Sequence, residues 1–191
     1  MKQKYTKIWI LAKEYLKQGV AKDFVLHTEG VVRAMEILLK EERAEENILI
    51  PAAILHDVGW AKVPKDLQKA SSKSKRIKAL KLHIANAPTI ILEILNKCHY
   101  SNSQARRIIE IVTSHKFKNP RNLEKRLLID ADQLSDAFKK QFYSDAMAYQ
   151  QKEEDFYLYR LNSNKFYTKS AKAIFLKQMN LRKKEIRLSF K

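Results

Sequence analysis

The sequence predicts an all-α protein with a single domain over residues 1–191. Apolar residues recur at helical spacing almost throughout the chain and alternate at strand spacing almost nowhere. Only three glycines and four prolines occur, too few for the tight turns of a sandwich, a barrel or a dinucleotide-binding sheet. With 191 residues, 45% of them hydrophobic, the chain is long enough to bury one core. We therefore expect a helical bundle.

The N-terminal segment, MKQKYTKIWILAKEYL, is basic and then apolar, as a signal peptide is. Lys13 and Glu14 interrupt the apolar run after a few residues, so the segment is predicted to be a helix. No stretch approaches the roughly 20 apolar residues of a membrane span. Cys98 is the only cysteine, which excludes an internal disulfide and a thiolate zinc cluster. We expect a soluble, cytoplasmic protein.

The next two predicted helices each carry a histidine on the apolar face. In KDFVLHTEGVVRAMEILLKEE, residues 22–42, His27 lies on the inner face. The apolar residues of that face are Val20, Phe24, Val31, Ala34, Met35 and Leu38. In AEENILIPAAILHD, residues 44–57, His56 continues an apolar stripe and Asp57 follows it directly. That stripe contains Ile48, Leu49, Ala52 and Ala53. Gly59 is expected to cap this helix at its C-terminus.

A polar, lysine-rich stretch comes next. Residues 61–84 are expected to form a loop and then a helix that starts near His83. The helical pattern resumes in NAPTIILEILNK, with Pro88 near a helix start. The segment SNSQARRIIEIVTSHKF, residues 101–117, opens with a Ser or Asn cap and ends its apolar stripe at His115. The other members of that stripe are Ile108, Ile111 and Val112.

Two amphipathic segments complete the pattern. Residues 123–150 place five apolar side chains on one face: Leu127, Ala131, Leu134, Phe138 and Phe142. Asp130 and Asp132 both lie beside that face, and periodicity does not choose between them. Residues 164–186 are predicted to form a last amphipathic helix with apolar residues available for packing: Phe166, Ile174, Phe175 and Leu181.

Four of the five histidines lie at or near inner-face positions, close to acidic residues. One such histidine is usually a core residue with satisfied hydrogen bonds, but four of them beside carboxylates indicate a shared cation. Buried carboxylates are tolerated when they are paired or bound to a metal. Imidazole and carboxylate ligands without cysteine suit Fe, Mn, Co, Ni, Zn or Mg and do not decide among them. The sequence predicts a site for one or two divalent metal ions.

These residues resemble the motif of the HD-domain metal-dependent phosphohydrolases, a His, then a His-Asp doublet, then a distal Asp. The match is His27 in LHTEGVVRAMEIL, the doublet in AAILHDVGW and Asp132 in LLIDADQLSD, and it selects Asp132 over Asp130. Members with two ions add histidines, which His83 and His115 match. The resemblance implies one ion on His27, His56, Asp57 and Asp132. It implies a second ion on Asp57, His83 and His115, so that Asp57 bridges.

The resemblance covers residues 20 to 140 approximately, and the helical region 141–191 is expected to pack on this core. The chain departs from two subfamilies. It lacks the Gly-Tyr-Pro signature of HD-GYP cyclic-dinucleotide phosphodiesterases and has Trp60 where these carry a lysine. It reads VGWAK where alarmone hydrolases and deoxynucleoside monophosphatases place acidic residues. Both subfamilies are therefore disfavoured.

The resemblance implies hydrolysis of a phosphoester or phosphoanhydride, of a nucleotide or another small phosphorylated molecule, through a metal-activated water with Asp57 as the catalytic residue. Lys62 and Lys116 are the basic residues nearest to the ligands in sequence, and we expect them to bind the substrate phosphate. The net charge of +17 favours an alternative, a nucleic-acid-binding or regulatory protein on the same scaffold with a structural or vestigial metal.

Overall fold

A computed structural model describes residues 1–116 and 119–188 of the chain. Over these residues the secondary structure is helical and no strand occurs, so the predicted all-α fold is confirmed. The α-helices are α1 (Thr6–Leu16), α2 (Phe24–Glu41), α3 (Glu46–Leu55), α4 (Lys65–Gln68), α5 (Lys73–Lys97), α6 (Asn102–Val112), α7 (Leu123–Ser135), α8 (Lys139–Ala148), α9 (Glu153–Ser163) and α10 (Lys169–Leu188). Two short 3₁₀ helices are η1 (Gln3–Tyr5) and η2 (Val58–Lys62).

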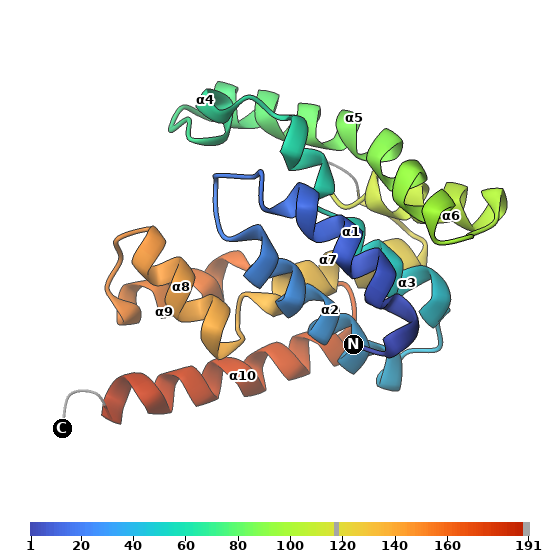
Figure 1. Ribbon diagram of the computed structural model, residues 1–191. Coiled ribbons are helices and arrows are strands. Elements are labelled where there is room, and N and C mark those ends of the chain that lie inside the picture. Colours follow the sequence, from blue (N-terminus) through green and yellow to red (C-terminus); the bar gives the residue numbers. More distant parts are fainter. Residues whose placement is uncertain (117–118, 189–191) are drawn as a thin grey trace.

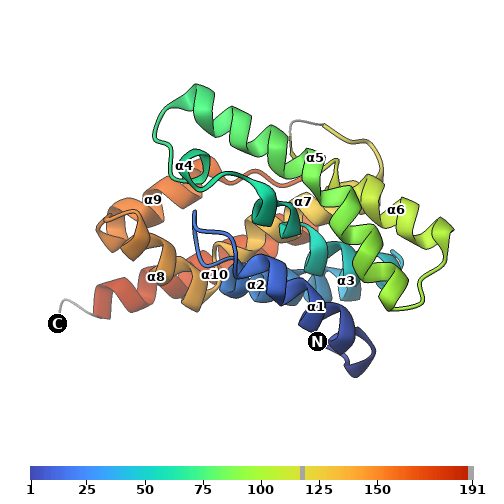
Figure 2. The ribbon, with the colours of Figure 1, turned by 45° about the horizontal axis from the view of Figure 1, so that its top comes forward.

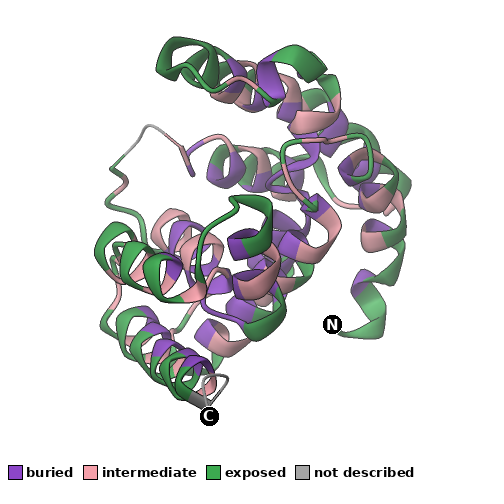
Figure 3. Ribbon diagram, turned by 90° about the vertical axis from the view of Figure 1, so that its left-hand side faces the viewer, coloured by how far each residue is buried: buried purple, intermediate pink, exposed green. Residues whose placement is uncertain are grey.

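Helix α2 lies at the centre of the bundle and packs against α7 and α3 (Figure 1). Helices α5 and α6 cross one side of this centre, and α10 runs along the other (Figure 1). Helix α5 packs on η2, α1 and α6 (Figure 2). The helices bury the faces that they turn toward one another and expose their outer faces (Figure 3). Among the described residues, no helix has the length and apolar character that crossing a membrane requires.

Polar side chains fix where several helices begin. The Asp23 side chain accepts a hydrogen bond from the Leu26 backbone at the start of α2. Ser101 and Gln104 form a capping box at the start of α6, as the Ser or Asn cap predicted. These bonds satisfy backbone N–H groups that the first turn of a helix leaves unpaired.

Helix α5 differs from the prediction at both of its predicted boundaries. It begins at Lys73, ten residues before His83, and it continues through Pro88 without a break. Lysine, arginine, alanine and leucine favour helices, and this helix buries Ala79 and His83 against the preceding segment. Packing on η2 therefore extends a helix where the polar composition predicted a loop.

The predicted cap at Gly59 is wrong. Gly59 lies inside η2, and no described glycine has a positive φ. A Cβ at Gly59 would lie 2.1 Å from the carbonyl oxygen of His83. The absence of a side chain thus allows α5 to approach η2, which brings His83 toward the His56–Asp57 doublet.

The C-terminal region also differs in detail. The segment 123–150 divides into α7 and α8, and α9 follows where no helix was predicted. The predicted stripe from Leu127 to Phe142 is buried throughout. In α10, Phe175 is buried as expected, but Leu181 is 42% exposed while Met179 and Ile186 are buried. Helix α10 packs on α9, α7 and α2.

Candidate metal centre

Six side chains from five parts of the chain converge at one place in the bundle. They are His27 of α2, His56 and Asp57 at the end of α3, His83 of α5, His115 after α6, and Asp132 of α7. The histidines and Asp57 are each at most 4% exposed, and the Asp132 side chain is 13% exposed. The apolar faces of their helices carry these polar groups into the core.

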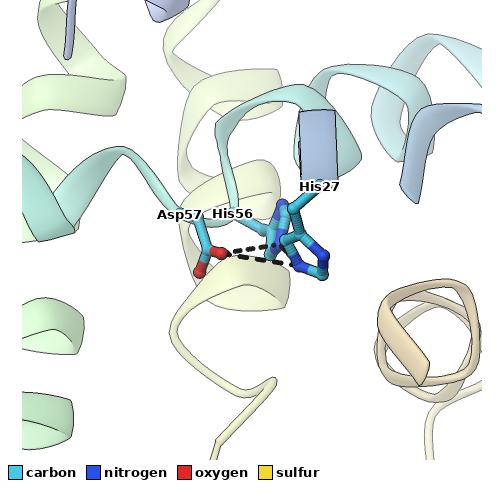
Figure 4. Close-up of side chains that lie close together, drawn as sticks. All are labelled: His27, His56 and Asp57. Atoms are coloured by element: carbon cyan, nitrogen blue, oxygen red, sulfur yellow. Dashed lines mark hydrogen bonds and ion pairs between the residues drawn. The ribbon is translucent and has the colours of Figure 1, made fainter. Parts of the chain in front are cut away.

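Asp57 stands between two pairs of histidines, and each of its oxygens faces one pair. Its Oδ2 lies 3.3 Å from His56 Nε2 and 3.6 Å from His27 Nε2. Figure 4 shows both rings turned toward this carboxylate. Its Oδ1 lies 3.5 Å from His83 Nε2 and 3.9 Å from His115 Nε2. These contacts form two groups of three ligand atoms that share Asp57, and each group is able to hold a metal ion.

Asp132 and Asp130 lie in different surroundings. Asp132 Oδ1 lies 3.0 Å from His27 Nε2 and 4.0 Å from His56 Nε2, beside the first group. Asp130 accepts hydrogen bonds from the backbone N–H groups of Tyr167 and Thr168 and from the Thr168 hydroxyl, at 2.7 to 2.9 Å. Asp130 therefore fastens the chain before α10 and does not reach the cluster.

Backbone carbonyls orient two of the rings. His56 Nδ1 lies 2.8 Å from the carbonyl oxygen of Ala53, and His115 Nδ1 contacts the carbonyl of Val112. A hydrogen on each Nδ1 leaves the Nε2 lone pair directed into the cluster, which is the arrangement of metal-binding histidines. The ring of Trp60 stacks on His83, with centroids 5.0 Å apart. Trp60 therefore packs against the cluster.

Several buried polar atoms at this place have no hydrogen-bond partner among the residues that the structure describes. They are Asp57 Oδ1, both ring nitrogens of His83, and His115 Nε2. Leaving a buried polar atom unpaired costs about 1–3 kcal/mol, so such atoms are uncommon unless something else satisfies them. Nitrogen and oxygen donors that face one another without partners fit a divalent cation.

The protonation states also fit a cation. Burial lowers the pKa of His27 and of His83 to about 4 and that of His115 well below its ordinary value. Burial alone would raise the pKa of Asp57, but the neighbouring His56 and Lys22 outweigh it and hold the pKa well below its usual range. His27, His83 and His115 are thus neutral and Asp57 is ionised near pH 7, as metal ligands must be.

Two lysines lie against the carboxylates. Lys116 Nζ donates a hydrogen bond of 2.5 Å to Asp132 Oδ2, and Lys22 Nζ lies 3.5 Å from Asp57 Oδ2. Burial lowers the pKa of Lys116, but Asp132 outweighs it, so the pKa is raised and the ammonium stays charged. Sequence reasoning missed Lys22, because nothing in its local pattern separates it from the many other basic residues.

Lys62 is not brought to the cluster. It is exposed at the end of η2, and its charge acts on Glu93. Glu93 lies ten residues beyond His83 on α5, about 15 Å along that helix. Lys62 is therefore close to the His56–Asp57 doublet in sequence but not in space.

Two adjoining hollows open beside the cluster. The larger hollow, of about 510 Å³, is lined by Asp57, Trp60, Tyr149 and four basic residues: Lys22, Lys69, Arg76 and Lys116. The smaller hollow, of about 310 Å³, is lined by His27, Asp132, Tyr149, Tyr159 and Arg160 among others. Lys22, Lys116 and Tyr149 line both hollows. A small anionic molecule can therefore reach the buried cluster from solvent.

Comparison with known families gives one result. A family model described as the HD domain matches residues 24–137, which include all six residues of the cluster. No curated protein and no solved structure matched the chain.

Proposed function

The chain belongs to the HD-domain family, and we propose that it is a metal-dependent phosphohydrolase. It would cleave a phosphoester or phosphoanhydride of a nucleotide or another small phosphorylated molecule. The observation that carries this proposal is the pair of buried three-ligand groups that share Asp57, with the ammonium groups of Lys22 and Lys116 beside them.

The ligand assignment follows the two groups. His27, His56, Asp57 and Asp132 would hold one ion, and Asp57, His83 and His115 would hold a second. A divalent ion bound there lowers the pKa of water and neutralises charge on a phosphoryl group. Asp57 would be the residue on which both ions depend.

The remaining residues would act on the phosphate and on the ligands. Lys116 and Lys22 are positioned to bind phosphate oxygens, since their ammonium groups border the cluster and line both hollows. Lys116 also holds the carboxylate of Asp132 through its hydrogen bond. The carbonyls of Ala53 and Val112 hold two imidazoles in the orientation that ligation requires.

The test compares Asp57→Ala with the wild type for metal content, by elemental analysis, and for hydrolysis of 4-nitrophenyl phosphate and bis(4-nitrophenyl) phosphate. Metal-free protein is first reconstituted separately with Mn, Fe, Co, Ni, Zn and Mg. We expect the variant to lose bound metal and at least 100-fold in turnover, because both groups lose their shared ligand.

The matched control is His99→Asn, which removes the one histidine outside the cluster. His99 is exposed and has a φ of 59°, a conformation that asparagine tolerates. Metal content and turnover should stay at wild-type values in this control. Retention of both by Asp57→Ala would refute the proposal.

A second function, binding of nucleic acid, is favoured by the charge of +17 and by an exposed basic segment. The first turns of α5 expose five basic residues: Lys73, Lys75, Arg76, Lys78 and Lys81. If this surface neutralises phosphates, binding of a 20-nucleotide RNA must weaken steeply with salt, since counterions are released. If the wild type shows no turnover and Asp57→Ala still binds the RNA in this salt-dependent way, the second function is favoured.

A further inference from the structure

We infer that Tyr149 and Tyr159 form a stacking surface for the nucleobase of the substrate. The inference rests on the proposed function and makes it more specific, because it selects a nucleotide over an aliphatic phosphoester. Both tyrosines lie outside residues 24–137, the part of the chain that the HD-domain model matches.

The two tyrosines lie beside the cluster and come from neighbouring helices. Tyr149 follows the last residue of α8, and Tyr159 is in α9, which packs against α8 (Figure 1). Tyr149 lines both hollows together with Lys22 and Lys116. Tyr159 lines the smaller hollow, which also contains His27 and Asp132. A molecule with its phosphate at the lysines can therefore place a further group against these rings.

Both tyrosine rings are largely exposed, and both contact the same buried aromatic ring. Tyr149 is 62% exposed and Tyr159 is 51% exposed, unusually high for large aromatic side chains. The buried ring of Phe156 lies 6.1 Å from each of them, centroid to centroid, and holds both from the inner side. Exposed aromatic faces at the mouth of a polar pocket are the usual feature of sites that stack planar ligands.

The charge of the smaller hollow fits a neutral group. Arg160 donates to Asp136 at 2.9 Å and to Asp145 at 2.7 Å, so its charge is already matched by two carboxylates. Its guanidinium also lies 5.7 Å from the centroid of the Tyr159 ring and stiffens that side chain. Lys69 and Arg76, which form no ion pair within the described part of the chain, line the other hollow instead. The smaller hollow therefore suits a neutral planar base, and the side-chain amide nitrogen of Gln133, which lines it, is a donor for such a base.

The experiment measures kcat and KM for adenosine 5′-monophosphate and for ethyl phosphate with Tyr149→Ala and Tyr159→Ala. We expect each substitution to raise KM for the nucleotide about tenfold, since stacking on one aromatic ring has about that effect on affinity. The KM for ethyl phosphate should change less than twofold, because that substrate has no ring. Tyr149→Phe and Tyr159→Phe should restore the nucleotide KM, since they keep the ring.

The matched controls are Met147→Ala and Leu158→Ala. These exposed residues are close to the tyrosines in α8 and α9, and they line neither hollow. Nucleotide KM should stay at the wild-type value in both. The inference would be overturned if Tyr149→Ala and Tyr159→Ala changed the KM of both substrates equally. It would also be overturned if they left the nucleotide KM unchanged.

Direct binding separates this inference from the proposed function. Adenosine 5′-monophosphate is titrated into each protein in a calorimeter at constant salt. If the wild type binds the nucleotide but hydrolyses neither substrate, the proposed function fails, and a tenfold weaker Kd in Tyr149→Ala and Tyr159→Ala still supports the stacking site. An undiminished affinity in these variants refutes it.

Discussion

Two aspartates two positions apart on α7 have different surroundings and different expected roles. Asp130 receives three hydrogen bonds from the segment before α10, and Asp132 lies beside His27. Sequence periodicity left both open, since both border the same apolar face. The order of motifs in the HD-domain family selected Asp132, and the geometry is consistent with that choice.

This difference predicts that two substitutions differ in their effect on bound metal. Asp130→Ala should lower the free energy of unfolding by about 2 kcal/mol or more, because buried donors lose their acceptor, while metal content stays unchanged. Asp132→Ala should lower metal content, and it should also lower the stability of the metal-free protein, because Lys116 and His27 lose the carboxylate that they contact. Urea unfolding in EDTA and elemental analysis measure the two effects. Metal loss in Asp130→Ala with full metal content in Asp132→Ala would contradict the assignment.

The lysines also differ in their expected roles. Lys22→Met and Lys116→Met should each reduce kcat/KM for a phosphoester about 10- to 100-fold, because a fixed cation at the phosphoryl group is lost. Metal content should stay unchanged. Lys62→Met is the matched control, and its activity should stay within twofold of wild type, since Lys62 is exposed and acts on Glu93. An equal loss of kcat/KM in all three variants would show that Lys22 and Lys116 do not differ from Lys62 in their role.

At the level of helices, the contact between η2 and α5 brings the second pair of histidines to the doublet. Gly59 allows it, because a Cβ there would overlap the His83 carbonyl at 2.1 Å. The side chain of Trp60 then covers the His83 ring. One glycine in η2 thus sets where α5 lies, and α5 sets where His83 lies.

We therefore expect Gly59→Ala to lower the free energy of unfolding by about 3 kcal/mol, because the obstructing atom belongs to the backbone of α5 and cannot rotate away. Gly30→Ala is the comparison. Its Cβ would lie 3.2 Å from Ser135 Cβ, and alanine favours the helix, so the change should stay within about 1 kcal/mol. Urea denaturation measures both. Similar midpoints for the two variants would show that α5 shifts freely.

Across the molecule, the site is assembled from the HD-domain core and from the helices that follow it. The core carries the six clustered residues, and α8 and α9 add Tyr149 and Tyr159 to the hollows beside them. We therefore expect the HD-domain core to carry out the chemistry, and α8 and α9 to contribute to the choice of substrate. Burying so many titratable groups in one cluster also links stability to pH.

Unfolding stability should fall as the pH is lowered from 7 to 5. Folding depresses the pKa of His27 and His83 from 6.5 to about 4, and His115 is shifted in the same direction. Between pH 6.5 and 4 the unfolded chain therefore binds protons that the folded chain does not. At pH 5, His27 and His83 have each lost about 2 kcal/mol of their contribution to the free energy of unfolding, and His115 acts in the same direction.

Two carboxyl groups act in the opposite direction. Burial raises the pKa of Asp136 to about 6 and raises that of Asp130 above its ordinary value, so acid relieves a cost of folding at these two groups. The three imidazoles outweigh them. Urea unfolding of EDTA-treated protein at pH 7 and at pH 5 measures the sum. Stability that is constant or higher at pH 5 would contradict these shifts.

Local pattern was enough to establish the all-α class, most of the helices and their inner faces, the inward histidines and the order of motifs, but it missed α9 and the first turns of α5. Each of these features depends on the spacing of residue types within one segment, and this spacing can be read directly from the sequence. The sequence did not reveal that α5 begins at Lys73, that Gly59 permits a close approach, that Lys22 and not Lys62 borders Asp57, or that Tyr149 and Tyr159 line the hollows. These features arise from contacts between segments far apart in the chain, and packing of the whole bundle determines them.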